Sequence, residues 1–379
     1  MHICFITHEY PKIGFSHGGL GTFVQTLARE LVKNGISVSV VGTNYSTRYE
    51  EEIDEGVNVF RCKSKKIKGL TWIFNASNIS RKIFDIHNSE RIDIVEGSEL
   101  SLAFIKKIPG VKYVIRMHGG HHFFAESENR KINRWKGYQE KRSFKRADRI
   151  IGVGQYVMDH TAHYINYNGK RGPVIYNPAN LEKFYQSDHS KSEQDRIFFA
   201  GTICEKKGIR QLVQALPIIK KEFPEVKLYI AGRDWFFNDG KSYAEYLKTF
   251  IGPELKDSII FLGQVSNDEI PGLIEKSEVC VYPSHMEAMP LAWIEVLAMG
   301  KAFVGSNKGP GSEVVIDGVT GLLCDPLDPN DIAEKVIFML RNKEKAREFG
   351  QNARNDILAR FNLSVIVKKN IDFYTNLVK

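Results

Sequence analysis

Residues 279–299 read VCVYPSHMEAMPLAWIEVLAM, and this stretch decides the fold class of the chain. Residues 279–282 form a short apolar run that is typical of a buried strand, and 291–299 form an apolar run of helical character. A buried strand that leads through a turn into a helix is a unit of a parallel α/β sheet. Two glutamates, Glu287 and Glu295, flank the predicted start of the helix.

The spacing of Glu287 and Glu295 suggests a ligand site. A carboxylate at a strand end and a second one in the following helix would both face a ligand above the helix N-terminus. Such a terminus offers unpaired N–H groups and the positive end of the helix dipole, which suit a phosphate. Carboxylates accept hydrogen bonds from sugar hydroxyls. We therefore expect a sugar-nucleotide site; the alternative is that Glu287 caps the turn and Glu295 is a solvated helix residue.

Alternating strand and helix signals occur in two series along the chain. In the first series we predict strands at 2–7, 37–42, 92–95, 112–117, 149–153 and 173–175, and helices at 19–34, 76–88, 130–146 and 155–164. In the second we predict strands at 196–200, 226–231, 258–262, 279–282, 302–305 and 322–324, and helices at 207–222, 242–250, 267–276, 291–299 and 328–342. This alternation predicts parallel sheets covered on both faces.

The polar stretch 177–195 (NPANLEKFYQSDHSKSEQD) separates the two series, and we predict that it is the linker. A chain of 379 residues is too long for one ordinary core. We therefore predict two doubly wound domains, over 1–176 and 177–362, followed by a terminal helix over 363–379. Ligands of such sheets bind at the C-terminal strand ends, and a cleft between two such domains is the expected active site.

Two glycine loops each follow a predicted strand and open a helix. Residues 18–22 read GGLGT and residues 201–208 read GTICEKKG. Glycine lets the backbone approach a phosphate, so the first loop favours phosphate contact over a simple turn. Lys207 stands at a helix start, where the dipole disfavours a cation unless the lysine meets a diphosphate. The alternative for Lys207 is a solvated side chain.

Three histidines, His118, His121 and His122, follow the predicted strand 112–117. They lack the acid cluster or the helical i, i+4 spacing of a metal site, so we expect no metal here. His118 is better placed for ligand contact, because it stands at the C-terminal end of a parallel strand. The chain contains no Asp-x-Asp motif for holding a divalent cation on a diphosphate. We therefore expect no metal and no cofactor.

The net charge of +8 is unevenly distributed: residues 1–180 hold 27 Lys and Arg against 17 Asp and Glu. The segment 130–149 alone holds 9 basic and 2 acidic residues. On a helix, Trp135, Tyr138 and Arg142 would share one face. Two interpretations remain open: contact with an anionic membrane surface, or a solvated helix whose aromatic side chains pack in the core. No nucleic-acid recognition motif accompanies the charge, so we expect no nucleic-acid partner.

Taken in order, these motifs resemble those of the retaining glycosyltransferases of family 4 over nearly the whole chain. The order is a glycine loop, a strand-end histidine, a second glycine loop with a lysine, and Glu-x7-Glu. The segments GPGSEVV at 309–315 and GVTGLL at 318–323 follow. The resemblance implies the GT-B fold: two Rossmann-like domains that face each other across a cleft, with the terminal helix returning to the first.

The resemblance also implies roles for individual residues. It assigns catalysis to His118, Glu287 and Lys207. It assigns donor binding to Gly18, Gly19, Thr202, Lys207, Val265, Met289, Leu291 and Glu295. In this assignment Glu295 binds ribose hydroxyls, Glu287 faces the donor sugar and Val265 belongs to the base-binding loop. One position departs from the family: Thr202 stands where an arginine is usual, and Arg233 and Lys206 are the candidates to replace its charge.

The implied activity is metal-independent, retaining transfer of a hexosyl group from a nucleotide-diphosphate sugar to a hydroxyl. The resemblance favours a UDP-sugar over GDP-mannose, and a glycan or lipid-linked acceptor in cell-surface polysaccharide or glycolipid synthesis. The five scattered cysteines indicate a reducing compartment, so we expect a cytoplasmic enzyme. The basic segment 130–149 favours a peripheral position at the inner membrane face. Two alternatives stay open: a non-catalytic sugar-nucleotide-binding protein, and a GT-B-fold sugar-nucleotide epimerase.

Overall fold

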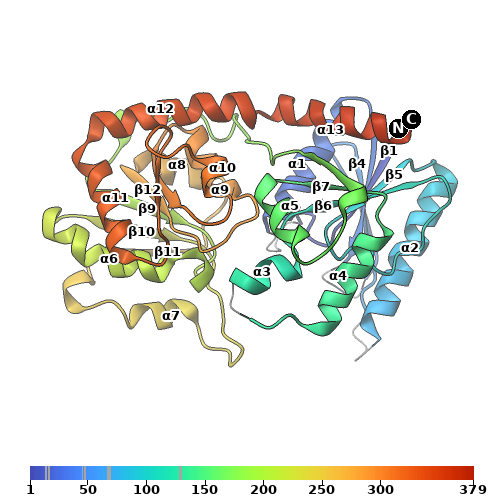
Figure 1. Cartoon of the computed structure of the whole chain (residues 1–379), viewed down its shortest axis with the longest axis horizontal. Helices are drawn as coiled ribbons and strands as arrows, with labels where there is room; N and C mark the ends of the chain where they lie inside the picture. Colours follow the sequence, from blue (N-terminus) through green and yellow to red (C-terminus); the bar gives the residue numbers. More distant parts are fainter. Residues whose placement is uncertain (13–14, 16–17, 45, 47, 66–69, 128–129) are drawn as a thin grey trace. The chain divides into compact units, whose positions relative to one another are not determined.

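The computed structural model describes residues 1–12, 15, 18–44, 46, 48–65, 70–127 and 130–379. These residues divide into two compact units. Unit 1 comprises Met1–Asn177 and Ser364–Lys379, and unit 2 comprises Pro178–Leu363. Each unit is a sheet with helices packed around it (Figure 1).

The sheet of unit 1 has the strand order β3-β4-β2-β1-β5-β6-β7-β8. Its strands are β1 His2–Ile6, β2 Ser37–Thr43, β3 Glu50–Asp54, β4 Val57–Cys62, β5 Ile94–Gly97, β6 Lys112–Met117, β7 Arg149–Gly152 and β8 Arg171–Val174. All pairs are parallel except β3–β4. Every residue of β1 is buried, as expected for a central strand that is covered on both faces.

The helices of unit 1 are α1 Gly19–Lys33, α2 Thr71–Ser89, α3 His121–Ser127, α4 Arg134–Arg146, α5 Gln155–Ala162 and α13 Leu363–Val378. In α1 the apolar side chains of Phe23, Leu27 and Leu31 are buried at four-residue steps. This spacing places them on one face of the helix, which packs on the sheet.

The antiparallel hairpin β3–β4 was not predicted from the sequence. The edge strand β3 reads EEEID, so it lacks the apolar run that marks a buried strand. Its turn is formed by Glu55 and Gly56, which both have positive φ, 48° and 87°. Two such residues in succession are typical of a two-residue hairpin turn. The charged side chains also protect the exposed edge of the sheet.

The sheet of unit 2 is entirely parallel and has the order β11-β10-β9-β12-β13-β14. Its strands are β9 Arg196–Ala200, β10 Lys227–Ala231, β11 Ile259–Gly263, β12 Val279–Tyr282, β13 Ala302–Ser306 and β14 Leu322–Cys324. Its helices are α6 Ile209–Glu222, α7 Tyr243–Lys248, α8 Ile270–Lys276, α9 Leu291–Ala298, α10 Gly311–Val314, α11 Pro329–Arg341 and α12 Lys343–Arg360. The direction of winding reverses between β9 and β12. In an open α/β sheet, ligands bind at this switch point.

The prediction that 177–195 is a linker is wrong, because most of this stretch packs on unit 2. The N–H group of Ala179 donates to the carbonyl of Phe361 at 2.8 Å, and that of Ser187 donates to Met299 at 3.0 Å. The side chain of Phe184 is buried. The stretch 177–195 is polar overall, so its composition gave no indication that Ala179 and Phe184 are buried.

A buried polar network anchors α13 within unit 1. The guanidinium of Arg116 pairs with Glu96, with Nε 2.7 Å from Oε1, and donates to the hydroxyl of Tyr374 at 3.0 Å and to Asn370 at 2.5 Å. Tyr374 in turn donates to Glu96 at 2.8 Å. Because charged groups this deeply buried need partners, the network ties the last helix of the chain to β5 and β6.

Candidate functional site

The loops that follow β9 and β12 are packed together at the switch point of unit 2. Gly208 has φ +69°, and a Cβ there would come within 1.8 Å of the carbonyl oxygen of Pro283. The N–H group of His285 donates to the carbonyl of Lys206 at 2.8 Å. Only glycine fits at position 208, for both conformational and steric reasons. This close approach holds the start of α6 against the end of β12.

Lys207 and Glu287, both predicted catalytic residues, meet at this junction as an ion pair. Their side chains are 25% and 12% exposed, so the pair is only partly solvated. The segment at Gly309 also packs on Glu287: a Cβ at Gly309 would lie 3.3 Å from the backbone of Glu287. An ammonium group has three N–H donors, so Lys207 retains donors for a ligand beyond the bond to Glu287.

The N-terminus of α9 follows Glu287 closely along the chain. The first helical donors are the N–H groups of Trp293 and Ile294, which both bond to the carbonyl of Pro290. The amides of Leu291 and Ala292 therefore precede the helical hydrogen-bond ladder. Met289, another predicted donor-binding residue, is buried just before the helix. The terminus thus combines amide donors with a positive dipole end.

Glu295 lies one turn into α9 and is half-buried. Burial raises the pKa of its carboxyl to about 7, although the positive charge of Lys183 opposes the shift. In the described part of the chain, its carboxylate has no hydrogen-bond or ion-pair partner. A carboxyl with a strongly shifted pKa at a helix start is a functional-site candidate.

Thr202, where the resemblance led us to expect an arginine, lies beside Arg233. The strand ends of β9 and β10 approach so closely that a Cβ at Gly232 would lie 1.8 Å from the carbonyl oxygen of Gly201. This brings the residues that follow these glycines together. Nε of Arg233 donates to Oγ1 of Thr202 at 3.4 Å. The guanidinium of Arg233 therefore lies next to Thr202.

A cavity of about 460 Å³ opens at the same end of β10 and β11. Gly232, Arg233, Gly263 and Gln264 contribute to its lining. Val265, the predicted base-binding position, follows the lining residue Gln264 directly and is half-buried.

In unit 1 the glycine loop packs against Glu9. A Cβ at Gly21 would come within 2.0 Å of the carbonyl oxygen of Glu9, and one at Gly18 within 2.7 Å of its carboxylate. The first helical bond of α1 runs from Thr22 N–H to Gly18, so the amide of Gly19 precedes the ladder. Glycine at 18 and 21 therefore has a packing explanation, and Gly19 is exposed at the helix start.

His118 lies at the end of β6, next to α1. Its ring centroid is 4.9 Å from that of Phe23, and its backbone N–H group donates to Oε1 of Glu99 at 2.6 Å. Burial, together with the charge of Arg116, lowers the pKa of His118 to about 3. The imidazole is therefore neutral near pH 7, so it offers a hydrogen bond rather than a full charge.

The other two histidines have separate partners. Nε2 of His121 accepts from the N–H group of Asn133 at 2.9 Å, and Nδ1 of His122 bonds to Glu140. Among the residues that the structure describes, no three His, Cys, Asp or Glu side chains form a group suited to a metal ion.

Sequence reasoning missed the carboxylates beneath this histidine loop. Glu99 and Glu140 are both buried, and burial raises the pKa of Glu99 to about 8, with a further contribution from the negative charge of Glu140. Through its bonds to the backbone after β6, Glu99 positions His118. No motif marks Glu99, and only its place just after the strand β5 hinted at a role.

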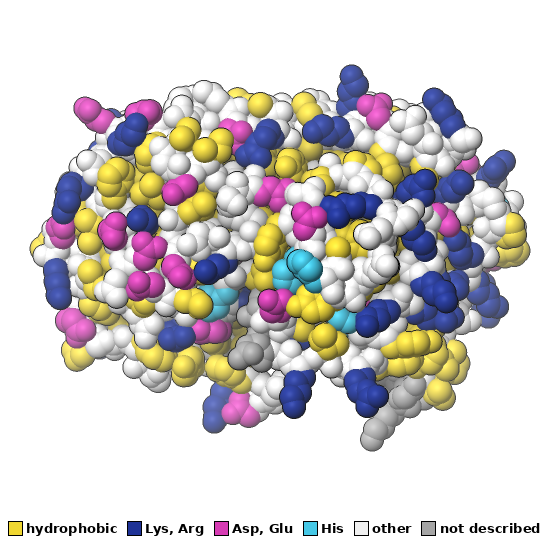
Figure 2. All heavy atoms as spheres, in the orientation of Figure 1, with side chains coloured by type: hydrophobic (Ala, Val, Ile, Leu, Met, Phe, Trp, Pro, Cys, Tyr) yellow, Lys and Arg dark blue, Asp and Glu magenta, His cyan; other side chains and the backbone are white. Residues whose placement is uncertain are grey.

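The aromatic residues of the basic segment divide between core and surface. Phe144 is buried, whereas Trp135 and Tyr138 are 44% and 50% exposed. The Trp135 ring stacks on Tyr138 at 5.7 Å, and Trp72 of α2 lies 5.2 Å away. Hydrophobic side chains show at the lower right of Figure 2, where Figure 1 places the starts of α2 and α4. No helix in the described part of the chain has the length and hydrophobicity to cross a bilayer.

Comparison with known families places this chain among glycosyltransferases. Residues 17–183 match the family described as Glycosyltransferase Family 4, and residues 182–356 match Glycosyl transferases group 1. The chain belongs to glycosyltransferase family 4. This glycosyltransferase is 25% identical to an uncharacterized glycosyltransferase of Methanocaldococcus jannaschii, over 91% of its own length and 90% of the relative. It is 23% identical to a glycogen synthase of Mycobacterium tuberculosis, over 99% and 94% of the two chains.

Solved structures confirm the predicted GT-B fold of this glycosyltransferase. Sucrose-phosphate synthase of Thermosynechococcus elongatus superposes with a TM-score of 0.85 at 19% identity, covering 99% of this chain and 98% of that one. HepE of Anabaena, in complex with UDP-glucose, superposes with a TM-score of 0.76 at 17% identity, covering 99% and 100%. At such identities the likeness establishes the fold.

Proposed function

We propose that this glycosyltransferase moves a hexosyl group from a nucleotide-diphosphate sugar to a hydroxyl, with retention of configuration and without a metal. The observation that carries the proposal is the Lys207–Glu287 ion pair beside the N-terminus of α9. A cation from the loop after β9 thus meets a carboxylate from the loop after β12, close in sequence to the amides that open α9.

The proposed reaction develops negative charge on the leaving diphosphate and positive charge on the sugar. Lys207 and the amides at Leu291 and Ala292 stabilise the diphosphate, and thus supply the positive charge that a metal would otherwise supply. Glu287 accepts a hydrogen bond from a sugar hydroxyl, and Glu295 accepts hydrogen bonds from the ribose. The bond from the anomeric carbon to the phosphate oxygen breaks, the bond to the acceptor oxygen forms on the same face, and the acceptor proton passes to the departing phosphate.

Arg233 is the proposed replacement for the missing family arginine. Its guanidinium contacts Thr202 at the end of β9, so it lies in the same group of strand ends as Lys207. A guanidinium binds phosphate through paired N–H groups. In unit 1, Gly18, Gly19 and His118 are proposed ligand contacts, through the amides at the start of α1 and a neutral imidazole.

The proposed donor is a UDP-sugar rather than GDP-mannose. HepE of Anabaena has been solved with UDP, with UDP and glucose, and with UDP-glucose, which supports this choice. The cavity of about 460 Å³ beside Gln264 and Val265 is the proposed site of the base.

A thermal-shift titration with UDP, GDP and their sugars, with and without EDTA, tests the donor proposal. A ligand that binds only the folded state adds about 2.7 kcal/mol at roughly 100 times its dissociation constant. We expect one UDP-sugar to raise the melting temperature, and we expect EDTA not to change this effect. A turnover assay should show release of UDP only when an acceptor is present. The anomeric configuration of the product should be that of the donor. Binding without acceptor-dependent release would favour the non-catalytic alternative. Isomerised sugar nucleotide without acceptor would favour the epimerase.

The proposed acceptor is lipid-linked, and an anionic membrane is the proposed partner of unit 1. We define the aromatic–basic surface as the exposed part of α4 with its neighbours from the start of α2, namely Leu70, Trp72, Ile73, Phe74, Lys131, Ile132, Arg134, Trp135, Lys136, Tyr138, Lys141 and Arg142. The one acidic residue in 130–147, Glu140, is fully buried against His122, so the outer face of α4 carries only positive charge.

The composition of this surface suits the interface of an anionic bilayer. Trp135 and Tyr138 present amphipathic rings, and exposed aromatic side chains favour the headgroup region. Basic side chains near such a membrane contribute about 1 kcal/mol each. Charge complementarity therefore favours an anionic lipid surface as the occupant, and glycan acceptors without a lipid are the alternative.

A further inference from the structure

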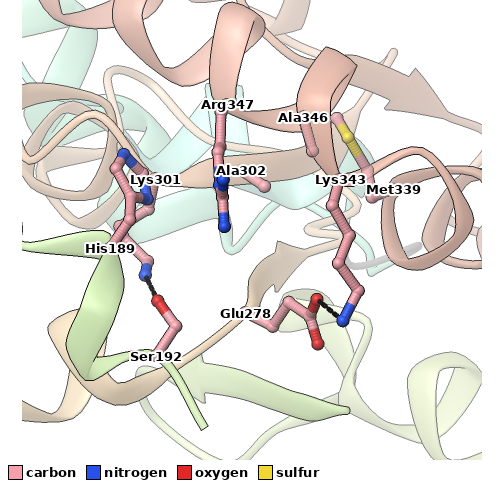
Figure 3. Close-up of a pocket in the computed structure, with 9 residues that line it drawn as sticks. All are labelled: His189, Ser192, Glu278, Lys301, Ala302, Met339, Lys343, Ala346 and Arg347. Atoms are coloured by element: carbon pink, nitrogen blue, oxygen red, sulfur yellow. Dashed lines mark hydrogen bonds and ion pairs between the residues drawn. The ribbon is translucent and has the colours of Figure 1, made fainter. Parts of the chain in front are cut away.

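A second pocket of unit 2 opens at the N-terminal ends of the strands, beside the first residues of β12 and β13 (Figure 3). Lys207 and Glu287 lie at the other end of the strands. Its volume is about 40 Å³. A cavity needs roughly 10–15 Å³ to hold one water, so this one has room for a small polar group of a few heavy atoms. Its charged lining residues are Glu278, Lys301, Lys343 and Arg347.

Lys301 is a buried cation, and no carboxylate in the described part of the chain forms an ion pair with it. Its side chain is 1% exposed, and Nζ donates to Oγ of Ser192 at 2.7 Å and to the backbone carbonyl of Glu275 at 3.0 Å. Both acceptors are neutral, and an ammonium has a third N–H. Burying such a charge is costly unless a negative charge accompanies it. Burial accordingly lowers the pKa of Lys301.

Arg347 adds a second positive charge to the same pocket. Its side chain extends from α12 toward the pocket (Figure 3). In the described residues no carboxylate pairs with its guanidinium. Burial is the main cause of the lowered pKa of Lys301; the charges of Glu275 and Glu278 oppose it, and the charge of Arg347 adds to it. The charge of Arg347 also lowers the pKa of His189, after burial and the charge of Lys301.

Glu278 is the carboxylate among the described lining residues, and it already has partners. Oε1 of Glu278 pairs with Nζ of Lys343 at 2.8 Å, and Oε2 accepts from the N–H group of Asp195 at 2.7 Å. Among the residues that the structure describes, the charges of Lys301 and Arg347 are therefore left without a paired anion in the lining of a small pocket.

We propose that this pocket binds a small phosphate-class oxyanion. Arginine binds a tetrahedral oxyanion through its planar fork of donors, and lysine adds a point charge. The volume suits inorganic phosphate or one terminal phosphoryl group. A whole nucleotide is too large. The anion would bridge α12 to the N-terminal ends of the strands β12 and β13, which lie at the other end of the sheet from Lys207 and Glu287. The proposal does not depend on the proposed transferase activity.

Thermal-shift titration with sodium phosphate, against sodium chloride at equal ionic strength, tests the proposal in the full-length protein. We expect phosphate to raise the melting temperature of the wild type. Arg347→Ala should weaken phosphate binding at least roughly 10-fold, because a charge-assisted contact is lost. Lys345→Ala is the matched control: it lies on the same helix, is exposed, pairs with Glu348 at 2.9 Å and does not line the pocket.

Lys207→Ala separates this pocket from the proposed donor site, which would also attract phosphate. We expect Lys207→Ala to keep the response to phosphate and Arg347→Ala to keep the response to UDP. The proposal is overturned if phosphate gives no shift beyond chloride, if Arg347→Ala responds like the wild type, or if Lys207→Ala abolishes the phosphate response. Arg347 is exposed, so its truncation should leave the fold intact, and circular dichroism checks this.

Discussion

The ammonium of Lys207 and the carboxylate of Glu287 form an ion pair although 80 positions separate them in the sequence. The pair exists because Gly208 lets the loop after β9 touch Pro283 at the end of β12. A salt bridge at this position orients Lys207 before a donor arrives. Glu287 therefore holds Lys207 in addition to its proposed contact with the sugar.

Lys207→Ala should lower the specificity constant kcat/KM roughly 10- to 100-fold, because a charged contact contributes about 1.5–3 kcal/mol. Glu287→Gln should reduce turnover as well, since it removes the charge that orients Lys207. Steady-state kinetics with the best UDP-sugar provide the measurement. Lys221→Ala, an exposed lysine of α6, is the control. Turnover by Lys207→Ala within about threefold of the wild type would rule out the assigned role.

UDP binding should strengthen as the pH rises from 6 to 8, because Glu295 loses its proton near pH 7 and the carboxylate accepts more hydrogen bonds than the acid. The stability of the ligand-free protein changes in the opposite direction. The folded state holds the Glu295 proton to a higher pH than the unfolded chain does. The contribution of Glu295 to the unfolding free energy therefore falls as the pH rises from the ordinary glutamate pKa through about 7. Calorimetric titration at several pH values tests the first effect. Glu295→Gln should flatten the pH profile of UDP affinity, and an unchanged profile would contradict the assignment.

Arg233→Ala should weaken UDP binding and lower turnover by roughly 10-fold or more, since a guanidinium–phosphate contact is charge-assisted. The double variant Thr202→Arg/Arg233→Ala should recover part of the loss, because it returns an arginine to the family position. The comparison of single and double variants is the informative one. Arg233→Ala with wild-type kinetics would show that no guanidinium is needed there.

The double variant Trp135→Ala/Tyr138→Ala should bind anionic vesicles at least roughly 10-fold more weakly, because burial of a large side chain contributes about 1.5–3 kcal/mol. Vesicle flotation with and without phosphatidylglycerol is the measurement. Binding of the wild type should fall as salt is added. Phe338→Ala, an exposed aromatic of α11, is the control. Wild-type binding that is indifferent to salt and to lipid charge would exclude the proposed surface.

Tyr374→Phe should destabilise α13 by about 1–3 kcal/mol, because it removes a buried hydroxyl that bonds to both Arg116 and Glu96. Hydrogen exchange should become faster over 364–378. Tyr185→Phe is the control, since that side chain is exposed and its hydroxyl makes a 3.3 Å bond. Unchanged protection of α13 would mean that the polar network does not anchor this helix.

The sequence alone determined the fold class and most of its elements. Buried strands such as β1, β6 and β12 are apolar runs, and amphipathic helices such as α1 carry an i, i+4 pattern, so local periodicity reveals both. It failed for β3, whose charged edge has no apolar run, and for α12, whose 18 residues are mostly polar around a narrow buried stripe that includes Phe349 and Ile357. The motif order also selected Lys207, Glu287 and Glu295 as candidates.

Only the tertiary structure decided how those residues interact. The Lys207–Glu287 pair, the contact between Arg233 and Thr202, and the bond from Glu99 to the loop at His118 each join residues from different strand ends. Such contacts depend on strand order and on the close approach of particular glycines. Local sequence patterns predict neither the strand order nor these close approaches. The tertiary structure also decided that Phe144 enters the core while Trp135 faces solvent, because the packing of α4 on its neighbours selects which face of the helix is covered.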